Sequence, residues 1–103
     1  MPETSPTETA RPALFRVATD IDTGSAADLK PRLLTELRTH GPSLILDLEA
    51  VQFIDSTGLG MLVSILKEAR QAGGNVRLIN PSREVMRLLQ ITGLEQVFEI
   101  GGT

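Results

Sequence analysis

Short apolar segments alternate with longer amphipathic segments along this chain from residue 14 onward. The apolar runs at 14–18, 44–48, 76–79 and 97–100 have the length and composition of strands, and the segments between them carry apolar residues at helical spacing. Alternation of this kind joins parallel strands through crossover helices. The pattern therefore predicts a single α/β domain in which helices pack on a mostly parallel sheet.

The start of the first predicted helix is ambiguous. Ser25 resembles a helix cap, but Pro31 would then lie past the first turn and remove a helical hydrogen bond. We predict that regular helix begins near Asp28, because proline is tolerated in a first turn. The three predicted helices then cover residues 28–39, 57–72 and 82–92.

The N-terminal segment differs in composition from the rest of the chain. Residues 1–12 are rich in Thr, Pro and Glu and have no apolar face. We expect a disordered tail here, with the alternative that its last residues add an edge strand. The folded domain is expected to cover residues 13–103.

The link between the second strand and the second helix concentrates hydroxyl, carboxylate and glycine residues. Asp55, Ser56 and Thr57 can each cap a helix, because a side-chain oxygen can accept an unpaired N–H group of the first turn. Gly58 and Gly60 follow, and each costs up to about 1 kcal/mol relative to alanine inside a helix. We expect these glycines to leave backbone N–H groups free and Ser56 accessible. Such a helix start attracts anions and could tolerate an added phosphate.

Composition excludes several classes of function. The chain has no cysteine and a single histidine, His40, which makes a transition-metal site or a cysteine nucleophile improbable. Its net charge of −3 and its three aromatic residues argue against nucleic-acid binding. No apolar run approaches the roughly 20 residues of a membrane span, and the N-terminus does not resemble a signal peptide. We expect a cytoplasmic protein with no cofactor, no metal and no membrane contact.

The polar cluster does not form a recognisable catalytic motif. A serine nucleophile needs a neighbouring base, and His40 is predicted at the opposite end of the following strand. Gly58 and Gly60 begin like a dinucleotide fingerprint, but Val63 stands where the third glycine should be. We therefore expect that the chain is not an enzyme, and that Ser56 is either a simple cap or a residue that another protein modifies.

The segment Phe-Ile-Asp-Ser-Thr-Gly-Leu-Gly at 53–60 resembles the signature of the STAS domain of anti-sigma factor antagonists. The resemblance extends from about residue 14 to residue 100 and implies a small mixed, mostly parallel β-sheet with crossover helices packed on it. In this family the serine after the aspartate is phosphorylated, and Ser56 holds that position. The resemblance also implies the partners. Unphosphorylated, the chain would bind an anti-sigma factor that is an ATP-dependent serine/threonine kinase; phosphorylation would release it, and a phosphoserine phosphatase would reset it.

The resemblance and the helical spacing together predict a partner-binding surface around Ser56. The family has an acidic residue near the phosphorylated serine, and Asp22 matches it, while Asp20 replaces a glutamate. Met61 and Ile65 fall at the edge of the apolar face of the second helix, where they either form an exposed patch for the partner or pack against a neighbouring helix. The predicted partner-binding residues are Asp22, Thr23, Asp55, Thr57, Gly58, Leu59, Gly60, Met61 and Ile65.

The sequence leaves a second reading open. The chain could be a STAS domain that is never phosphorylated, acting as a scaffold or as an accessory subunit of a transporter or signalling complex. Ser56 would then be a cap, and the surface around it a permanent docking site. In either reading we expect a monomer in isolation.

Overall fold

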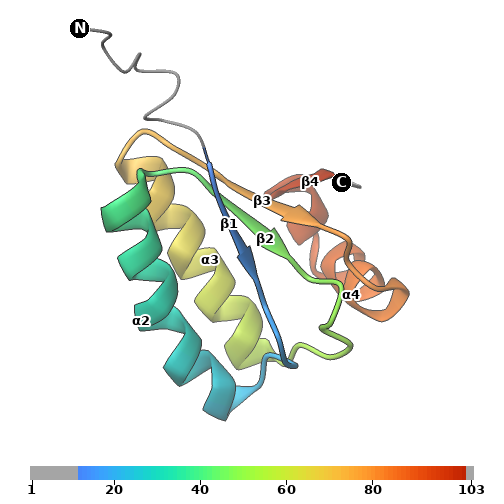
Figure 1. The fold of residues 1–103 in the computed structure, drawn as a ribbon. Coiled ribbons are helices and arrows are strands. Elements are labelled where there is room, and N and C mark those ends of the chain that lie inside the picture. The colour runs from blue at the N-terminus through green and yellow to red at the C-terminus, as the bar shows by residue number, and fades with distance from the viewer. Residues whose placement is uncertain (1–11, 102–103) are drawn as a thin grey trace, which may run out of the picture.

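The computed structural model describes residues 12–101, which form the predicted alternation of strands and helices (Figure 1). A short 3-10 helix, η1, was not predicted, and the last strand begins two residues later than expected, at Glu99. The predicted tail, residues 1–12, lies outside the described residues except for Pro12. The elements are β1 (Ala13–Arg16), α2 (Thr23–His40), β2 (Leu44–Asp47), α3 (Ser56–Gln71), β3 (Val76–Ile79), α4 (Arg83–Thr92), η1 (Leu94–Gln96) and β4 (Glu99–Gly101).

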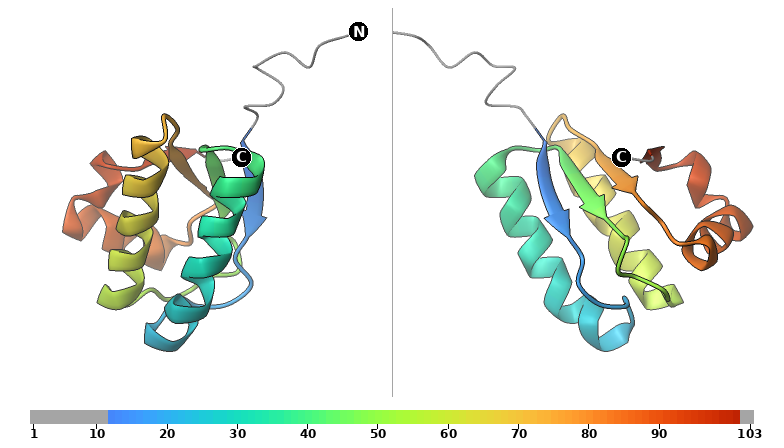
Figure 2. Two further views of the ribbon diagram at one scale, coloured as in Figure 1. Left: turned by 90° about the vertical axis from the view of Figure 1, so that its left-hand side faces the viewer. Right: turned by 45° about the vertical axis from the view of Figure 1, so that its right-hand side comes forward.

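The strands form one sheet in the order β1-β2-β3-β4, and every neighbouring pair within the described residues is parallel. The predicted α/β fold is thus confirmed. Right-handed crossovers that always step in the same direction carry successive helices to one face of a sheet. Figure 2 shows α2 and α3 side by side on that face.

The two faces of the sheet differ in burial. The row of paired residues Phe15, Leu46, Leu78 and Ile100 faces the core, with Leu46 and Leu78 fully buried. In the neighbouring row, which points the other way, Leu14, Arg77 and Glu99 are exposed and Ile45 is half-buried. The helices therefore cover one face of the sheet, and much of the other face is open within residues 12–101.

Helix α2 begins earlier than predicted. Asp22, not Ser25, is its N-cap: the Asp22 carboxylate accepts a hydrogen bond from the Ser25 backbone N–H at 2.9 Å, and the Ser25 hydroxyl accepts one from the Asp22 N–H at 2.9 Å. This reciprocal capping box satisfies two backbone donors and starts the helix at Thr23. Pro31 consequently lies inside the helix. The helix continues past it because Ala26, Leu29 and Leu33 are buried in the core, which outweighs one missing hydrogen bond.

A buried carboxylate ties together the ends of three strands. Asp47, at the end of β2, accepts hydrogen bonds from the Glu49 backbone N–H at 3.0 Å and from the Asn80 side-chain amide at 3.2 Å. Arg16, at the end of β1, lies 3.5 Å from its other oxygen. The Glu49 N–H bond, together with the Asn80 amide and the Arg16 guanidinium, holds the pKa of Asp47 below its usual 3.8 despite burial. The ionised form of Asp47 is therefore favoured by folding.

We predict that Asp47→Ala lowers the free energy of unfolding by about 1–3 kcal/mol at pH 7, because it removes a buried hydrogen-bond acceptor. Folding lowers the pKa of Asp47, so the stability it contributes is present at neutral pH and is lost as pH falls below 3.8. The difference in the free energy of unfolding between the wild-type protein and the variant should therefore become smaller in acid. Urea unfolding from pH 7 to below pH 3.8 measures this, with Glu49→Ala as the exposed control. A gap that stays constant with pH would contradict the role of the charge.

Candidate functional site

The site is built where two loops are joined by backbone hydrogen bonds. Ile21 forms an isolated parallel bridge with Ile54: its N–H donates to the Phe53 carbonyl at 3.0 Å, and its carbonyl accepts from the Asp55 N–H at 3.1 Å. The Asp20 carboxylate accepts from the backbone N–H groups of Gln52 and Phe53 at 2.8 and 3.2 Å. These bonds hold the loop before α2 against the loop before α3, so that both helix N-termini meet at one end of the domain.

Each of the two helices is capped by an aspartate. Asp22 caps α2, and the backbone N–H and hydroxyl of Ser25 hold the pKa of Asp22 below its usual 3.8. Asp55 caps α3 by accepting the Gly58 N–H at 2.8 Å. The Thr23 hydroxyl lies between the caps, 3.5 Å from the Asp55 carboxylate and 3.4 Å from the Thr57 hydroxyl. Four of the residues predicted from the sequence, Asp22, Thr23, Asp55 and Thr57, thus lie at the same end of the domain.

Ser56 is the first residue of α3, and its side chain is exposed. The sequence left open whether Ser56 itself caps the helix; the structure assigns this role to Asp55. Replacing Ser56 therefore leaves the cap intact, and the cost of about 1 kcal/mol associated with losing a cap does not apply to it. The Ser56 hydroxyl is accessible at the positive end of a helix dipole.

The two glycines of α3 have different roles, which corrects the expectation that both keep the helix start free. Gly58 is buried, and its N–H is used by the Asp55 cap. A Cβ at Gly58 would lie 2.5 Å from the Ile21 carbonyl oxygen and 2.8 Å from the Ile21 side chain. A Cβ at Gly60 would meet nothing within 4 Å. Gly58 is thus required by packing, whereas Gly60 leaves open surface.

The predicted exposed patch of Met61 and Ile65 is wrong, because both side chains are buried, with exposed fractions of 6% and 0%. Leu59 is buried as well. The reason is that α3 packs against the sheet and also against α2. Its apolar residues must therefore cover a wider arc of the helix than contact with the sheet alone requires. Both residues therefore belong to the core and do not form an exposed patch.

A shallow groove runs between α2 and α3 directly beside Ser56. Thr57 and Gly60 line it from α3, and Thr23 lines it from the start of α2. Apart from Met61, sequence reasoning missed the other residues that line this groove, since nothing in the spacing within one helix reveals which residues of a second helix lie opposite. The remaining lining residues are Ala26, Ala27, Lys30, Pro31, Met61 and Ser64.

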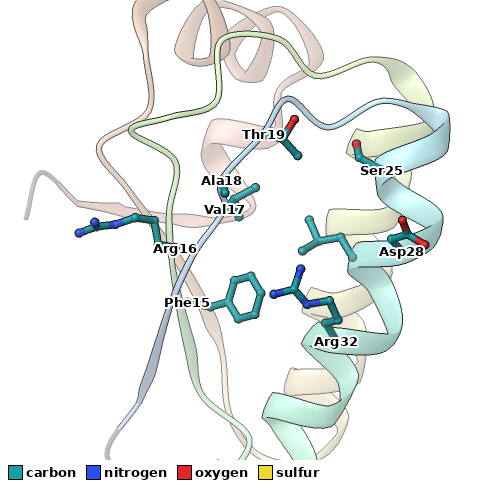
Figure 3. A pocket seen from close by; sticks show the side chains of 9 residues that line it. Phe15, Arg16, Val17, Ala18, Thr19, Ser25, Asp28 and Arg32 are labelled. Atoms are coloured by element: carbon teal, nitrogen blue, oxygen red, sulfur yellow. The ribbon is translucent and has the colours of Figure 1, made fainter.

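A second hollow lies on the other side of α2, against β1 (Figure 3). Arg32 of α2 and Phe15 of β1 face each other there, with the guanidinium carbon 5.1 Å from the ring centroid, and Asp28 lies one turn before Arg32. None of the partner-binding residues predicted from the sequence lines this hollow. Within residues 12–101, no group of histidine and acidic side chains is arranged to hold a metal ion, and no helix is long and apolar enough to cross a bilayer.

The fold and site define a small α/β domain that presents a serine at the start of a helix, and comparison with known proteins identifies its family. The STAS domain model matches residues 3–103, and the chain belongs to this family. A Bacillus subtilis relative named an anti-sigma-B factor antagonist is 38% identical over 84 residues, which cover 82% of this chain and 76% of the relative.

Solved structures agree with this assignment. The crystal structure of a Thermotoga maritima protein, described as a candidate anti-sigma factor antagonist, matches with a TM-score of 0.82 at 30% identity, covering 87% of this chain and 78% of the other. The anti-sigma factor antagonist SpoIIAA in its unphosphorylated form matches with a TM-score of 0.74 at 22% identity, covering 89% and 82%. At that identity the second likeness concerns the fold alone.

We predict opposite effects for alanine at the two glycines. Gly58→Ala should lower the free energy of unfolding by about 1–3 kcal/mol, because the added methyl collides with Ile21. Gly60→Ala should raise it by up to about 1 kcal/mol, because alanine favours the helix and the position is open. Urea unfolding of both variants tests this pair, each serving as the control for the other. Equal effects would show that the close approach at Gly58 does not constrain the fold.

Proposed function

We propose that this chain is an anti-sigma factor antagonist that binds an anti-sigma factor kinase while Ser56 is unphosphorylated and is switched off by phosphorylation of Ser56. The observation that carries the proposal is the exposed Ser56 at the first position of α3, with its hydroxyl not needed for the cap. The B. subtilis relative is named for the same kind of activity. Antagonists of this kind are regulators, in keeping with the expectation that the chain is not an enzyme.

The switch in this proposal is electrostatic. A phosphate adds about −1.5 to −2 charges beside the carboxylates of Asp55 and Asp22. The N-terminus of α3 tolerates this charge, because its dipole and remaining N–H groups favour anions. A partner surface docked over a neutral hydroxyl does not tolerate it. A tenfold loss of affinity needs only about 1.4 kcal/mol, so one phosphate at the contact suffices without a change of fold.

The partner is proposed to contact the surface around Ser56, including the groove between α2 and α3. Thr23, Thr57 and Gly60 are exposed there and offer hydroxyl groups and open backbone. Gly58, Leu59, Met61 and Ile65 support this surface from within, because they are buried. In this proposal the exposed residues of the predicted set contact the partner, and the buried ones hold the surface in place.

The other components of the cycle are proposed on the same basis. ATP is bound by the kinase, so the chain itself needs no cofactor, and a phosphoserine phosphatase returns it to the active form. The net charge of −3 does not favour a nucleic-acid partner. We propose that the protein acts in the cytoplasm and is a monomer until it meets the kinase. A STAS scaffold that is never phosphorylated is the alternative that the following experiments separate from this proposal.

Phosphate incorporation tests the acceptor residue. Incubation with ATP and candidate anti-sigma factor kinases, followed by intact mass measurement, should show one phosphate on the wild-type protein and on Thr57→Ala, and none on Ser56→Ala. Thr57 is the matched control because it carries an exposed hydroxyl at the next position. The free energy of unfolding of Ser56→Ala should change by no more than about 0.5 kcal/mol, since Asp55 keeps the cap. Undiminished incorporation in Ser56→Ala would overturn the assignment.

Binding to the kinase that modifies the chain tests the switch. Ser56→Asp should weaken binding at least tenfold, because it places a negative charge where the partner meets a neutral hydroxyl, while Ser56→Ala should bind like the wild-type protein. Titration calorimetry without ATP measures all three affinities. Equal affinities for the three proteins would favour the permanent scaffold.

A further inference from the structure

The loop beside Ser56 presents a large apolar side chain to solvent. Phe53 is 54% exposed, although it lies between the buried residues Val51 and Ile54. Only two residues separate it from Ser56, so the two Cα atoms lie within about 11 Å of each other. An aromatic ring left in water next to a modification site contributes little to the core of this domain.

The backbone of Phe53 is held on both sides. Its N–H donates to the Asp20 carboxylate at 3.2 Å, and its carbonyl accepts from the Ile21 N–H at 3.0 Å. Neither bond uses the aromatic ring. The ring is therefore carried on a fixed backbone, which lowers the entropic cost of using it as a contact.

Phe53 also forms one wall of an apolar groove that reaches to α4. Ile54 continues this wall, and Val85 and Leu88 of α4 form the opposite one, with Leu88 half-buried. This groove lies between the Phe53 loop and α4, whereas the groove described above lies between α2 and α3. The surface around Ser56 thus has an apolar part that sequence reasoning did not find.

Three acidic residues lie near the loop that carries Phe53. Glu84, in the first turn of α4, lines the groove, Asp20 bonds to the backbone of Phe53, and Asp55 follows two residues later. An apolar side chain with acidic residues nearby is complementary to an apolar pocket flanked by basic side chains. A second copy of this chain would bring the same acidic residues against each other, which argues against self-association through this surface.

We propose that Phe53 is an anchor for the anti-sigma factor kinase, inserting into an apolar pocket of the kinase that is flanked by Lys or Arg residues. This inference rests on the proposed function and adds to it a second contact, distinct from the phosphorylated hydroxyl. Aromatic anchors near the centre of an interface carry a large share of the binding energy. In this proposal Phe53 contributes binding energy, and phosphorylation of Ser56 prevents the kinase from binding.

The test compares Phe53→Ala with Ile91→Ala in binding to the purified kinase that phosphorylates Ser56. Ile91 is the matched control, because it is also apolar and is 70% exposed on α4. Phe53→Ala should weaken binding at least tenfold, which corresponds to about 1.4 kcal/mol, and Ile91→Ala should not weaken it. Thermal unfolding shows whether both variants remain folded. Glu84→Lys, with Glu68→Lys on α3 as its control, provides a second readout that should weaken binding more at low salt than at high salt.

The outcomes separate the two proposals. If the wild-type protein binds its kinase and Phe53→Ala binds equally well, the anchor is overturned while the proposed function stands. If no kinase binds or modifies the wild-type protein, the proposed function fails and the anchor fails with it. If the wild-type protein dimerises in sedimentation experiments without the kinase and Phe53→Ala does not, a second copy of the chain covers the Phe53 ring. The kinase is then not the partner of this ring.

Discussion

The first turn of α3 lies so close to Ile21 that no side chain fits at Gly58, and the geometry of the site depends on this approach. The Ile21–Ile54 bridge brings the loop before α2 against the loop before α3, and the Asp55 cap then fixes the direction in which α3 leaves the sheet. Ser56, the next residue, consequently points to solvent. A larger residue at Gly58 would push the helix away and change both the cap and the exposure of the serine.

The acidic residues of this region have structural tasks as well as an electrostatic one. Asp20 holds the loop that carries Phe53, Asp22 and Asp55 cap two helices, and each accepts backbone N–H groups. The backbone N–H groups that they accept hold these carboxylates in place near Ser56. The negative field around the proposed phosphorylation site is therefore a consequence of how the loops and helices are held. An added phosphate meets this field at a helix start that favours anions, which is why the proposed switch requires no rearrangement of the domain.

The surface around Ser56 has a polar part and an apolar part. The groove between α2 and α3 offers hydroxyls, open backbone and Lys30, whereas the groove toward α4 offers the Phe53 ring. A partner that covers Ser56 can contact both. The apolar part would supply affinity, and the polar part would sense the state of the hydroxyl, so that binding and its regulation lie on adjacent residues without being the same contact.

The sequence by itself determined the order of the strands and helices, the parallel sheet and the family, because periodicity, capping residues and a short motif are local properties. It also pointed to Ser56, Asp22 and Asp55. Only the tertiary structure decided that Asp55 is the cap, that Gly58 is required by Ile21, that Met61 and Ile65 are buried and that Phe53 is exposed. It also moved the start of α2 to Thr23. Burial and close approach depend on which residues distant in the chain lie opposite, and the spacing within one helix or loop carries no information about that neighbour.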